Sequence, residues 1–237
     1  MKTLVIHAAK LRERGEHIDR MLRSMGMDYE FVSEADADAL TDALVDRYLA
    51  DGPEQMRQKN ARASCTIKHF LACQRIVDGG WEGALVLEDD IVLHTGFKAA
   101  FERSLDEWRR RYGGQPVVIS YEDSSLQFVP RSRRQAGQML YPGNKDRMAG
   151  AYFVSLAAAR AISDSLREAP SRVPVDCYHY ELLRRGVILY LWCQPALATQ
   201  GSFTGAFRSS LSKKKDRMIV IRWWFKKNYK RLLYWLR

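Results

Sequence analysis

Three consecutive carboxylates, Glu88, Asp89 and Asp90, follow the apolar run of residues 84–87 and precede a second apolar run. An unbroken apolar run predicts a fully buried strand, and in open α/β sheets ligands bind beyond the carboxyl ends of the strands. Adjacent carboxylates raise one another's pKa unless a cation neutralises them, and a divalent ion that bridges to substrate phosphates is the usual solution. The motif therefore predicts a metal-assisted phosphate site, with an acidic turn after a strand as the alternative.

The segments around these acids alternate between strand and helix, which is typical of a Rossmann-like α/β layer. Strands are predicted at residues 3–8, 29–33, 84–88, 116–121, 149–155 and 187–192, and helices at residues 16–25, 36–50, 66–77, 97–112, 156–167 and 176–185. Residues 122–146 are basic and turn-rich and are predicted to form an active-site loop. With 237 residues, 46% of them hydrophobic, the chain is expected to form one catalytic domain.

Further motifs surround the acids in a fixed order. Residues 64–69 read Ser-Cys-Thr-Ile-Lys-His, and a predicted helix joins them to the acidic motif. The other blocks are residues 4–7, 13–18, 150–155 and 173–176. Together they resemble the hallmarks of glycosyltransferase family 25, the lipopolysaccharide and collagen glycosyltransferases, over most of residues 3–205.

This resemblance implies an α/β fold: a single GT-A-like, Rossmann-type domain over residues 1–212 with a mostly parallel central sheet. The implied reaction is transfer of a sugar, galactose or another hexose, from a UDP-sugar to an acceptor hydroxyl, with inversion at the anomeric carbon. The acceptor would be a glycan or lipid-linked glycan such as the lipopolysaccharide core. The family also implies Mn²⁺ or Mg²⁺, which would act as a Lewis acid on the diphosphate.

The resemblance also implies roles for individual acids. Asp90 would contact the metal directly, and Glu88 would reach the metal through water or hold the ribose. Asp89 would assist Asp90 or Glu88 in binding the donor. Asp176, which follows a rigid Val-Pro-Val segment, would be the base that accepts the proton of the acceptor hydroxyl. Capping of the helix that follows is the alternative role for Asp176.

Three basic side chains complete the predicted site. His69 would lie in the donor pocket, or be a hydrogen-bonded structural histidine. His179 follows Asp176 by three residues, so it could share a helical face with it and ligate the metal. Arg14 would bind the diphosphate, because a guanidinium suits phosphate oxygens, although a surface arginine in a turn is also common.

The positive charge of the chain is concentrated at its carboxyl end. Residues 213–237 contain ten Lys or Arg and one acid, a net charge of +9 out of the total of +10, which leaves about +1 for the rest. The tail is predicted to be a basic amphipathic helix with aromatic residues on both faces, a composition typical of segments that lie on anionic membranes. The apolar side comprises Ile221, Trp224, Phe225, Tyr229, Leu232, Trp235 and Leu236.

The cellular location is predicted from the tail together with three further features. The first residues are not typical of a secretory leader, no stretch has the apolar length of a membrane span, and the four cysteines lack zinc spacing. The sequence therefore predicts a cytoplasmic protein, peripheral on the inner face of the cytoplasmic membrane, with no nucleic-acid partner. Packing of the tail on the domain, or binding of the tail to single-stranded nucleic acid, are the alternatives.

Two alternative functions are consistent with the sequence. Ser64 and Lys68 stand where the family has Gly and Ser, so the chain could be a catalytically inactive sugar-nucleotide-binding or scaffold protein of glycan assembly. A metal-dependent nucleotidyltransferase also uses clustered acids at a strand end. Donor binding without turnover would indicate the first alternative, and pyrophosphate release from a nucleoside triphosphate the second.

Overall fold

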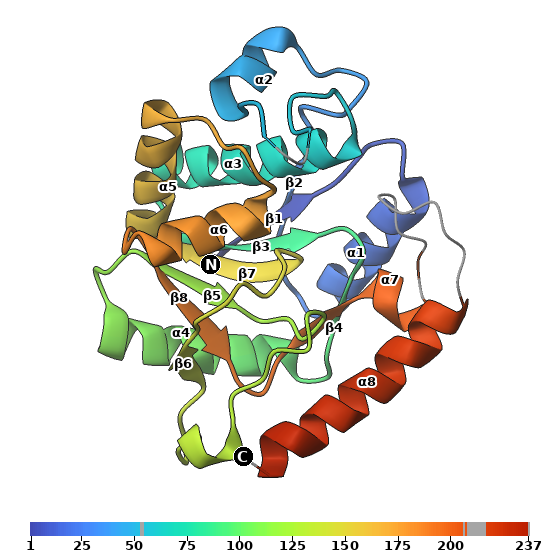
Figure 1. The fold of residues 1–237 in the computed structure, drawn as a ribbon, viewed down its shortest axis with the longest axis vertical. Helices are drawn as coiled ribbons and strands as arrows, with labels where there is room; N and C mark the ends of the chain where they lie inside the picture. Colours follow the sequence, from blue (N-terminus) through green and yellow to red (C-terminus); the bar gives the residue numbers. More distant parts are fainter. Residues whose placement is uncertain (53–54, 206, 208–216, 237) are drawn as a thin grey trace.

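The structure is a computed structural model that describes residues 1–52, 55–205, 207 and 217–236. Within these residues, seven strands form one sheet in the order β2-β1-β3-β7-β5-β8-β6 (Figure 1). The strands are β1 (Lys2–Ile6), β2 (Glu30–Val32), β3 (Gly83–Glu88), β5 (Val117–Ser120), β6 (Leu140–Pro142), β7 (Ala151–Ser155) and β8 (Leu189–Cys193).

The sheet is mixed, and the expectation of a mostly parallel sheet was wrong. β1 runs parallel to β2 and β3, and β5 runs parallel to β8. β7 runs antiparallel to both β3 and β5, and β6 runs antiparallel to β8. The reversal of β7 follows from its connection, because residues 121–150 contain no crossover helix and return the chain to the edge at which β5 ends.

Helices cover both faces of the sheet (Figure 1). One layer contains α2 (Asp42–Tyr48), α3 (Ala61–Gly79), α5 (Leu156–Glu168) and α6 (Val175–Arg184), and the other contains α1 (Arg12–Ser24) and α4 (Phe97–Tyr112). Alternate residues of each strand enter opposite cores: Ala84 and Val86 face the first layer, whereas Leu85 and Leu87 face the second. This two-sided burial explains why the strands read as continuous apolar runs.

Helix α3 carries several of the predicted site residues, and its ends have clear sequence causes. The Asn60 side chain accepts hydrogen bonds from the Arg62 and Ala63 N–H groups, and Gly80 ends the helix in a left-handed conformation with φ 59°. The cap places the first turn at Ala61, five residues before the predicted start. Cys65 and His69 therefore lie in the first half of a rigid helix that packs against β1 and β3.

Shorter elements complete the carboxyl-terminal part. η1 (Arg131–Arg133) is one turn of 3₁₀ helix, and β4 (Ile91–Leu93) pairs with β9 (Ala198–Gln200) in a separate antiparallel ribbon. α7 (Gly201–Thr204) follows directly, and α8 (Arg217–Leu236) lies along the outside of the domain (Figure 1). Within the described ranges, no helix combines the length and the apolar character needed to cross a bilayer.

Candidate active site

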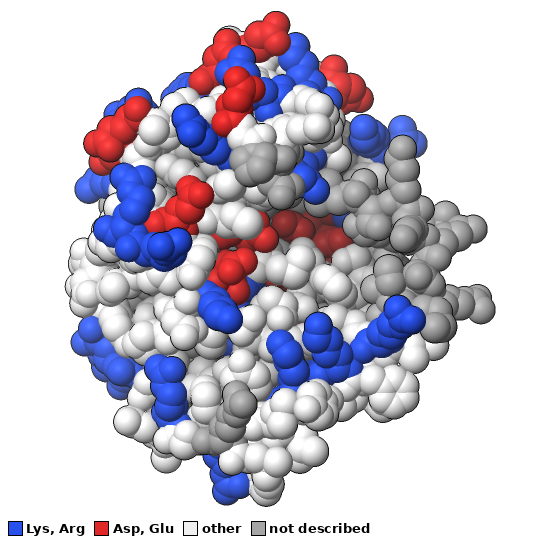
Figure 2. Space-filling model, in the orientation of Figure 1, with Lys and Arg blue, Asp and Glu red and all other residues white. Residues whose placement is uncertain are grey.

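Four strands deliver polar residues to the same edge of the sheet. His7 follows β1, Glu88 ends β3, and Glu122 follows β5, because these strands run in the same direction. Gly150 precedes the antiparallel β7 and therefore lies at this edge too, where its carbonyl accepts a hydrogen bond of 2.8 Å from the Glu88 N–H. Figure 2 shows acidic side chains at the bottom of a hollow near the middle of the molecular face that it draws.

Asp89 is held by two basic side chains. His7 Nδ1–H donates to Asp89 Oδ2 at 2.8 Å, and Arg14 Nη1 donates to Asp89 Oδ1 at 3.2 Å. All three residues are buried. Asp89 is therefore bonded through both of its carboxylate oxygens, and it fixes the turn that presents its two acidic neighbours.

Asp90 is buried but only partly satisfied. Arg14 Nη1 lies 3.3 Å from Asp90 Oδ2, whereas Asp90 Oδ1 is buried without a hydrogen-bond partner. Burial and the neighbouring charge of Glu88 raise the pKa of Asp90 to about 7, against the lowering effect of Arg14. An unpartnered oxygen on a buried carboxylate is the arrangement that a bound cation would complete.

Glu88 lies between three polar side chains. Gln200 Nε2 donates to Glu88 Oε2 at 3.0 Å, while His69 Nε2 and Cys65 Sγ lie 3.5 and 3.8 Å from Glu88 Oε1. Burial, followed by the charges of Asp89 and Asp176, raises the pKa of Glu88 to about 7. A carboxylate pair with such pKa values holds a proton near neutral pH unless a metal displaces it.

His69 is fully buried at the back of the site. Its Nδ1 lies 3.0 Å from the hydroxyl of Tyr152, and burial lowers its pKa to about 3. The ring is therefore neutral at physiological pH. The structure places His69 beside Glu88 and gives it the hydrogen bond expected of a structural histidine, and its role in a donor pocket stays a prediction.

His179 lies one ring farther from the acids. It packs edge-on against Tyr152, with ring centroids 5.2 Å apart, and burial lowers its pKa to about 3. Among the described residues, the ligand atoms that lie within 4.8 Å of one another belong to Cys65, His69 and Glu88, and neither those of His179 nor those of Asp90 are in this group. The structure thus does not bring His179 and Asp90 together as a ligand set.

Asp176 lies in the first turn of α6, after the residue that begins the helix. The N-cap is Pro174, so Asp176 is not the capping residue, although its Oδ1 accepts a hydrogen bond of 2.9 Å from the Cys177 N–H. Its charge contributes to the raised pKa of Glu88 and opposes the lowering of the pKa of His69. Burial raises the pKa of its carboxyl group.

The two positions that depart from the family pattern are well accommodated. Lys68 is buried, and its Nζ donates to the His7 carbonyl at 2.5 Å and forms an ion pair with Asp36. The Ser64 hydroxyl donates to the Ala35 carbonyl at 2.8 Å. Both side chains therefore fasten helix α3 to the loop after β2.

Sequence reasoning assigned no catalytic or binding role to three residues of the site: His7, Gln200 and Glu122. Glu122 is fully buried, and burial together with the charges of Glu88 and Asp90 raises its pKa well above the ordinary value. An acid two residues beyond the strand of residues 117–120 was the available signal for Glu122, since it lies at the edge of the sheet where Glu88 ends β3. For Gln200, which comes 112 residues after Glu88, the sequence offered no comparable signal.

Comparison with known proteins is consistent with this site. Residues 1–179 match the model of glycosyltransferase family 25, described as an LPS biosynthesis protein. Because the match covers well over half of the sequence, the chain belongs to glycosyltransferase family 25, a family of sugar-transferring enzymes. The matched region contains the acidic motif, helix α3 and Asp176.

Two individual proteins resemble the chain less closely than the family model does. A protein of Aedes aegypti described as a glycosyltransferase 25 family member is 28% identical over 185 residues, which cover 73% of this chain and 30% of that protein. The chain thus spans less than a third of the length of this curated relative. The apo structure of mouse xyloside xylosyltransferase 1 aligns with 80% of this chain and 70% of its own, at 12% identity and a TM-score of 0.40, a likeness too distant to assign a substrate.

Proposed function

We propose that the protein is an inverting glycosyltransferase with a GT-A-like arrangement. It would move galactose or another hexose from a UDP-sugar to a hydroxyl of a surface glycan such as the lipopolysaccharide core. The observation that supports this most strongly is the pair Glu88 and Asp90 at the edge of the sheet, with an unpartnered Asp90 oxygen and Arg14 alongside. Membership of the family supplies the reaction class.

The residues of the site fit a divalent cation. Glu88 and Asp90 would hold Mn²⁺ or Mg²⁺, since hard cations prefer oxygen ligands and both pKa values are raised by burial and by neighbouring carboxylates despite the charge of Arg14. When bound, the cation would neutralise the diphosphate and stabilise it as the leaving group. His179 is left out of this ligand set because its ring packs against Tyr152 instead.

Arg14 and Asp89 are proposed to position the donor. Arg14 is held in place by Asp89 and Asp90, so its guanidinium is oriented before a diphosphate arrives. Asp89 is bonded to His7 and Arg14 and acts on the donor through Arg14. We also propose that Glu88 accepts a hydrogen bond from a ribose hydroxyl, with its carboxylate oriented by Gln200.

Asp176 is the proposed base. In the transfer, the bond between the anomeric carbon and the phosphate oxygen breaks, the acceptor oxygen bonds to the opposite face of that carbon, and the hydroxyl proton passes to the Asp176 carboxylate. A pKa raised by burial makes this carboxylate a stronger proton acceptor than an exposed aspartate. His69 and Tyr152 support the neighbouring Glu88.

The proposal is tested with a panel of sugar nucleotides and the purified protein in Mn²⁺ or EDTA. We expect slow release of UDP from one donor, lost in EDTA and in Asp90→Asn. Asp106→Asn is the matched control, because Asp106 is an exposed acid on α4. The control should keep full activity.

Binding measured by calorimetry on the same samples separates the alternatives. Donor binding without any hydrolysis, and without transfer to a panel of glycan acceptors, would indicate an inactive sugar-nucleotide-binding protein. Pyrophosphate release from a nucleoside triphosphate would indicate a nucleotidyltransferase. No binding of any sugar nucleotide, with or without metal, would rule out the proposed function.

A further inference from the structure

Helix α8 rests on the domain through the face that contains its partly buried residues. Trp223 stacks on Phe203 with ring centroids 5.6 Å apart, and its Nε1–H donates to the Ser124 carbonyl at 3.0 Å. Near the other end of the helix, Tyr234 packs edge-on against Phe128, 5.7 Å away. These contacts fix the rotation of α8 about its own axis.

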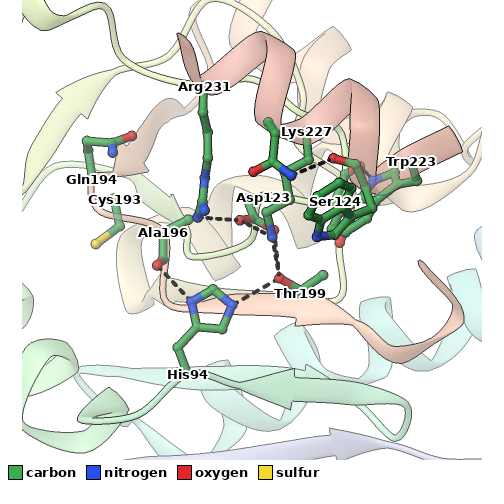
Figure 3. A network of polar contacts seen from close by, with 12 residues as sticks. His94, Asp123, Ser124, Cys193, Gln194, Ala196, Thr199, Trp223, Lys227 and Arg231 are labelled. Carbon is green, nitrogen blue, oxygen red and sulfur yellow. Dashed lines mark hydrogen bonds and ion pairs between the residues drawn. The ribbon is translucent and has the colours of Figure 1, made fainter. Parts of the chain in front are cut away.

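A buried ion pair holds the middle of the helix (Figure 3). Lys227 Nζ lies 2.8 Å from Asp123 Oδ2, the other oxygen of which accepts a hydrogen bond of 2.6 Å from Thr199. Asp123 is fully buried, and Arg231 approaches the same oxygen at 3.7 Å. The docking of α8 is therefore specific, because it supplies the counter-charge of a buried carboxylate.

This rotation turns the apolar side of α8 away from the protein. Nine large hydrophobic side chains are exposed among the described residues, and all but Met1 and Leu189 lie on α8. We call these seven the aromatic stripe: Ile221, Trp224, Phe225, Tyr229, Leu232, Trp235 and Leu236, each 51–67% exposed. They recur at helical spacing, so they form one continuous surface, and such a patch on a soluble domain marks an interaction site.

The charges around the aromatic stripe indicate its partner. α8 contains no acid, and Arg222 and Lys226 are exposed beside the stripe. Figure 2 shows a row of basic side chains over α8, next to the acidic hollow. Two copies packed stripe against stripe would bring like charges together, whereas an anionic lipid surface offers both apolar depth and opposite charge.

We propose that the aromatic stripe is a surface for binding the anionic headgroup region of a bilayer. α8 lies in the plane of the interface with the stripe inserted, and Lys227 and Trp223 keep the domain attached on the other side. Tryptophan and tyrosine rings favour the interface between the lipid headgroups and the acyl chains. The exposed Arg222 and Lys226 reach lipid phosphates there. The proposal rests on α8 alone, so it stands whether or not the proposed function does.

Vesicle sedimentation of the full chain tests the proposal. We expect binding to vesicles of phosphatidylglycerol and phosphatidylethanolamine, and weak or no binding to phosphatidylcholine. The double variant Trp224→Ser/Phe225→Ser should lose at least about tenfold in affinity, since it removes inserted rings. Leu189→Ser is the control, because it removes an exposed apolar side chain away from α8 and should leave binding unchanged.

A second pair of variants tests the charge. Arg222→Glu/Lys226→Glu should weaken binding to anionic vesicles by about tenfold or more at low salt. Arg110→Glu/Arg160→Glu makes the same change in net charge on α4 and α5, and should bind as the wild type does. Circular dichroism and thermal unfolding confirm that each variant folds.

Three results would overturn the proposal. The first is wild-type binding of vesicles by Trp224→Ser/Phe225→Ser. The second is a dimer, seen by light scattering, that this variant dissociates while vesicle binding is absent, since a second copy would then cover the stripe. The third is tighter binding to a single-stranded oligonucleotide than to anionic vesicles at matched salt.

Discussion

At the scale of single residues, three consecutive acids differ because of their partners. Asp89 is bonded through both oxygens to basic side chains, whereas Asp90 keeps one buried oxygen without a partner and Glu88 meets neutral donors. The pKa values of Glu88 and Asp90 are consequently raised to about 7. Asp89 therefore orders the turn, and its neighbours are the two acids that we propose to hold a cation.

The raised pKa of Asp90 predicts how stability depends on pH. The native state retains the Asp90 proton up to about pH 7, but the unfolded chain loses it near its ordinary value of 3.8, so this group destabilises the native protein increasingly as pH rises from about 4 to 7. Asp90→Asn should therefore gain stability relative to wild type over that range, by on the order of 2 kcal/mol or more at pH 8.

The measurement is urea unfolding of both proteins in EDTA at pH 5 and pH 8. The difference between the two proteins removes the contributions of His69 and His179, which both share, and reports Asp90 together with Glu88 and Glu122, the acids that interact with it. Adding Mn²⁺ at pH 8 should stabilise the wild type and leave Asp90→Asn nearly unchanged. A stability difference that does not vary with pH would contradict the raised pKa.

At the scale of elements, two glycines show how strand ends shape the site. A Cβ on Gly150 would lie 2.6 Å from Glu122 Oε2 and 3.1 Å from Gln200 Nε2, which orients Glu88. Gly150→Ala should therefore displace these side chains and lower kcat/KM about 10- to 100-fold, because small misplacements in a site are costly. Steady-state kinetics with the donor that the sugar-nucleotide panel identifies checks this.

Gly83 is the matched control at the other end of β3. A Cβ there would lie 2.6 Å from the Val154 carbonyl oxygen, a backbone atom that cannot move aside. Gly83→Ala should cost about 1–3 kcal/mol of unfolding free energy while kcat/KM of the folded protein changes little. Equal kinetic losses in both variants would show that Gly150 has no special relation to the site.

The docking of α8 predicts unequal effects for two basic residues on one helix. Lys227→Met leaves the buried Asp123 carboxylate without its nearest cation, a loss of about 3 kcal/mol for the docked helix. Arg231 is 56% exposed and lies farther from Asp123, so Arg231→Met should cost less than about 1 kcal/mol.

Hydrogen exchange of the α8 amides measures this docking. Exchange should rise at least about tenfold in Lys227→Met only. Adding Asp123→Asn to Lys227→Met should recover part of the protection, since the buried charge is then removed. Equal exchange in the Lys227 and Arg231 variants would contradict the ion pair.

At the scale of the whole molecule, β7 joins the two halves of the sheet. β2, β1 and β3 lie on one side of it and β5, β8 and β6 on the other, so within the described fold the halves pair only through β7. Phe153, at its centre, is fully buried and packs 4.7 Å from the ring of Trp108. The domain should therefore unfold as one unit.

Phe153→Ala should lower the free energy of unfolding by about 3–5 kcal/mol and leave a single transition. Tryptophan fluorescence and far-ultraviolet circular dichroism, recorded in the same urea titration, should give the same midpoint. Two separated midpoints would mean that the halves of the sheet are independent.

Much of the secondary structure could be predicted because its causes are local. The helix at residues 97–112 coincides with α4, and the apolar runs around residues 84–88 and 117–120 are strands, since periodicity and Gly signals act within a few residues. Strand direction was not predictable for β7, because an apolar run buried on both faces reads the same in either direction. The apolar run of residues 91–93, after the acids, is β4, but its pairing with β9 was missed because the two strands are more than 100 positions apart.

The candidate site was predictable to a similar extent. The motif located Glu88, Asp89 and Asp90, and the resemblance pointed to His69 and Asp176, which act on each other electrostatically in the structure. The partner of Glu88, Gln200, could not be found, because only the folded chain brings β9 beside β3. His179 lies on the same helix as Asp176, as predicted, but its ring packs against Tyr152, which also contacts His69.

The position of β7 has a consequence for synthesis on the ribosome. β3 is complete once residue 88 has been added, but the strand that covers its second edge ends only at Ser155. For the time needed to add nearly seventy further residues, the nascent chain therefore exposes the hydrogen-bonding edge of one of its most apolar strands. At about 5–20 residues per second this interval lasts several seconds, long enough for chaperones to be needed and for slow translation to increase aggregation.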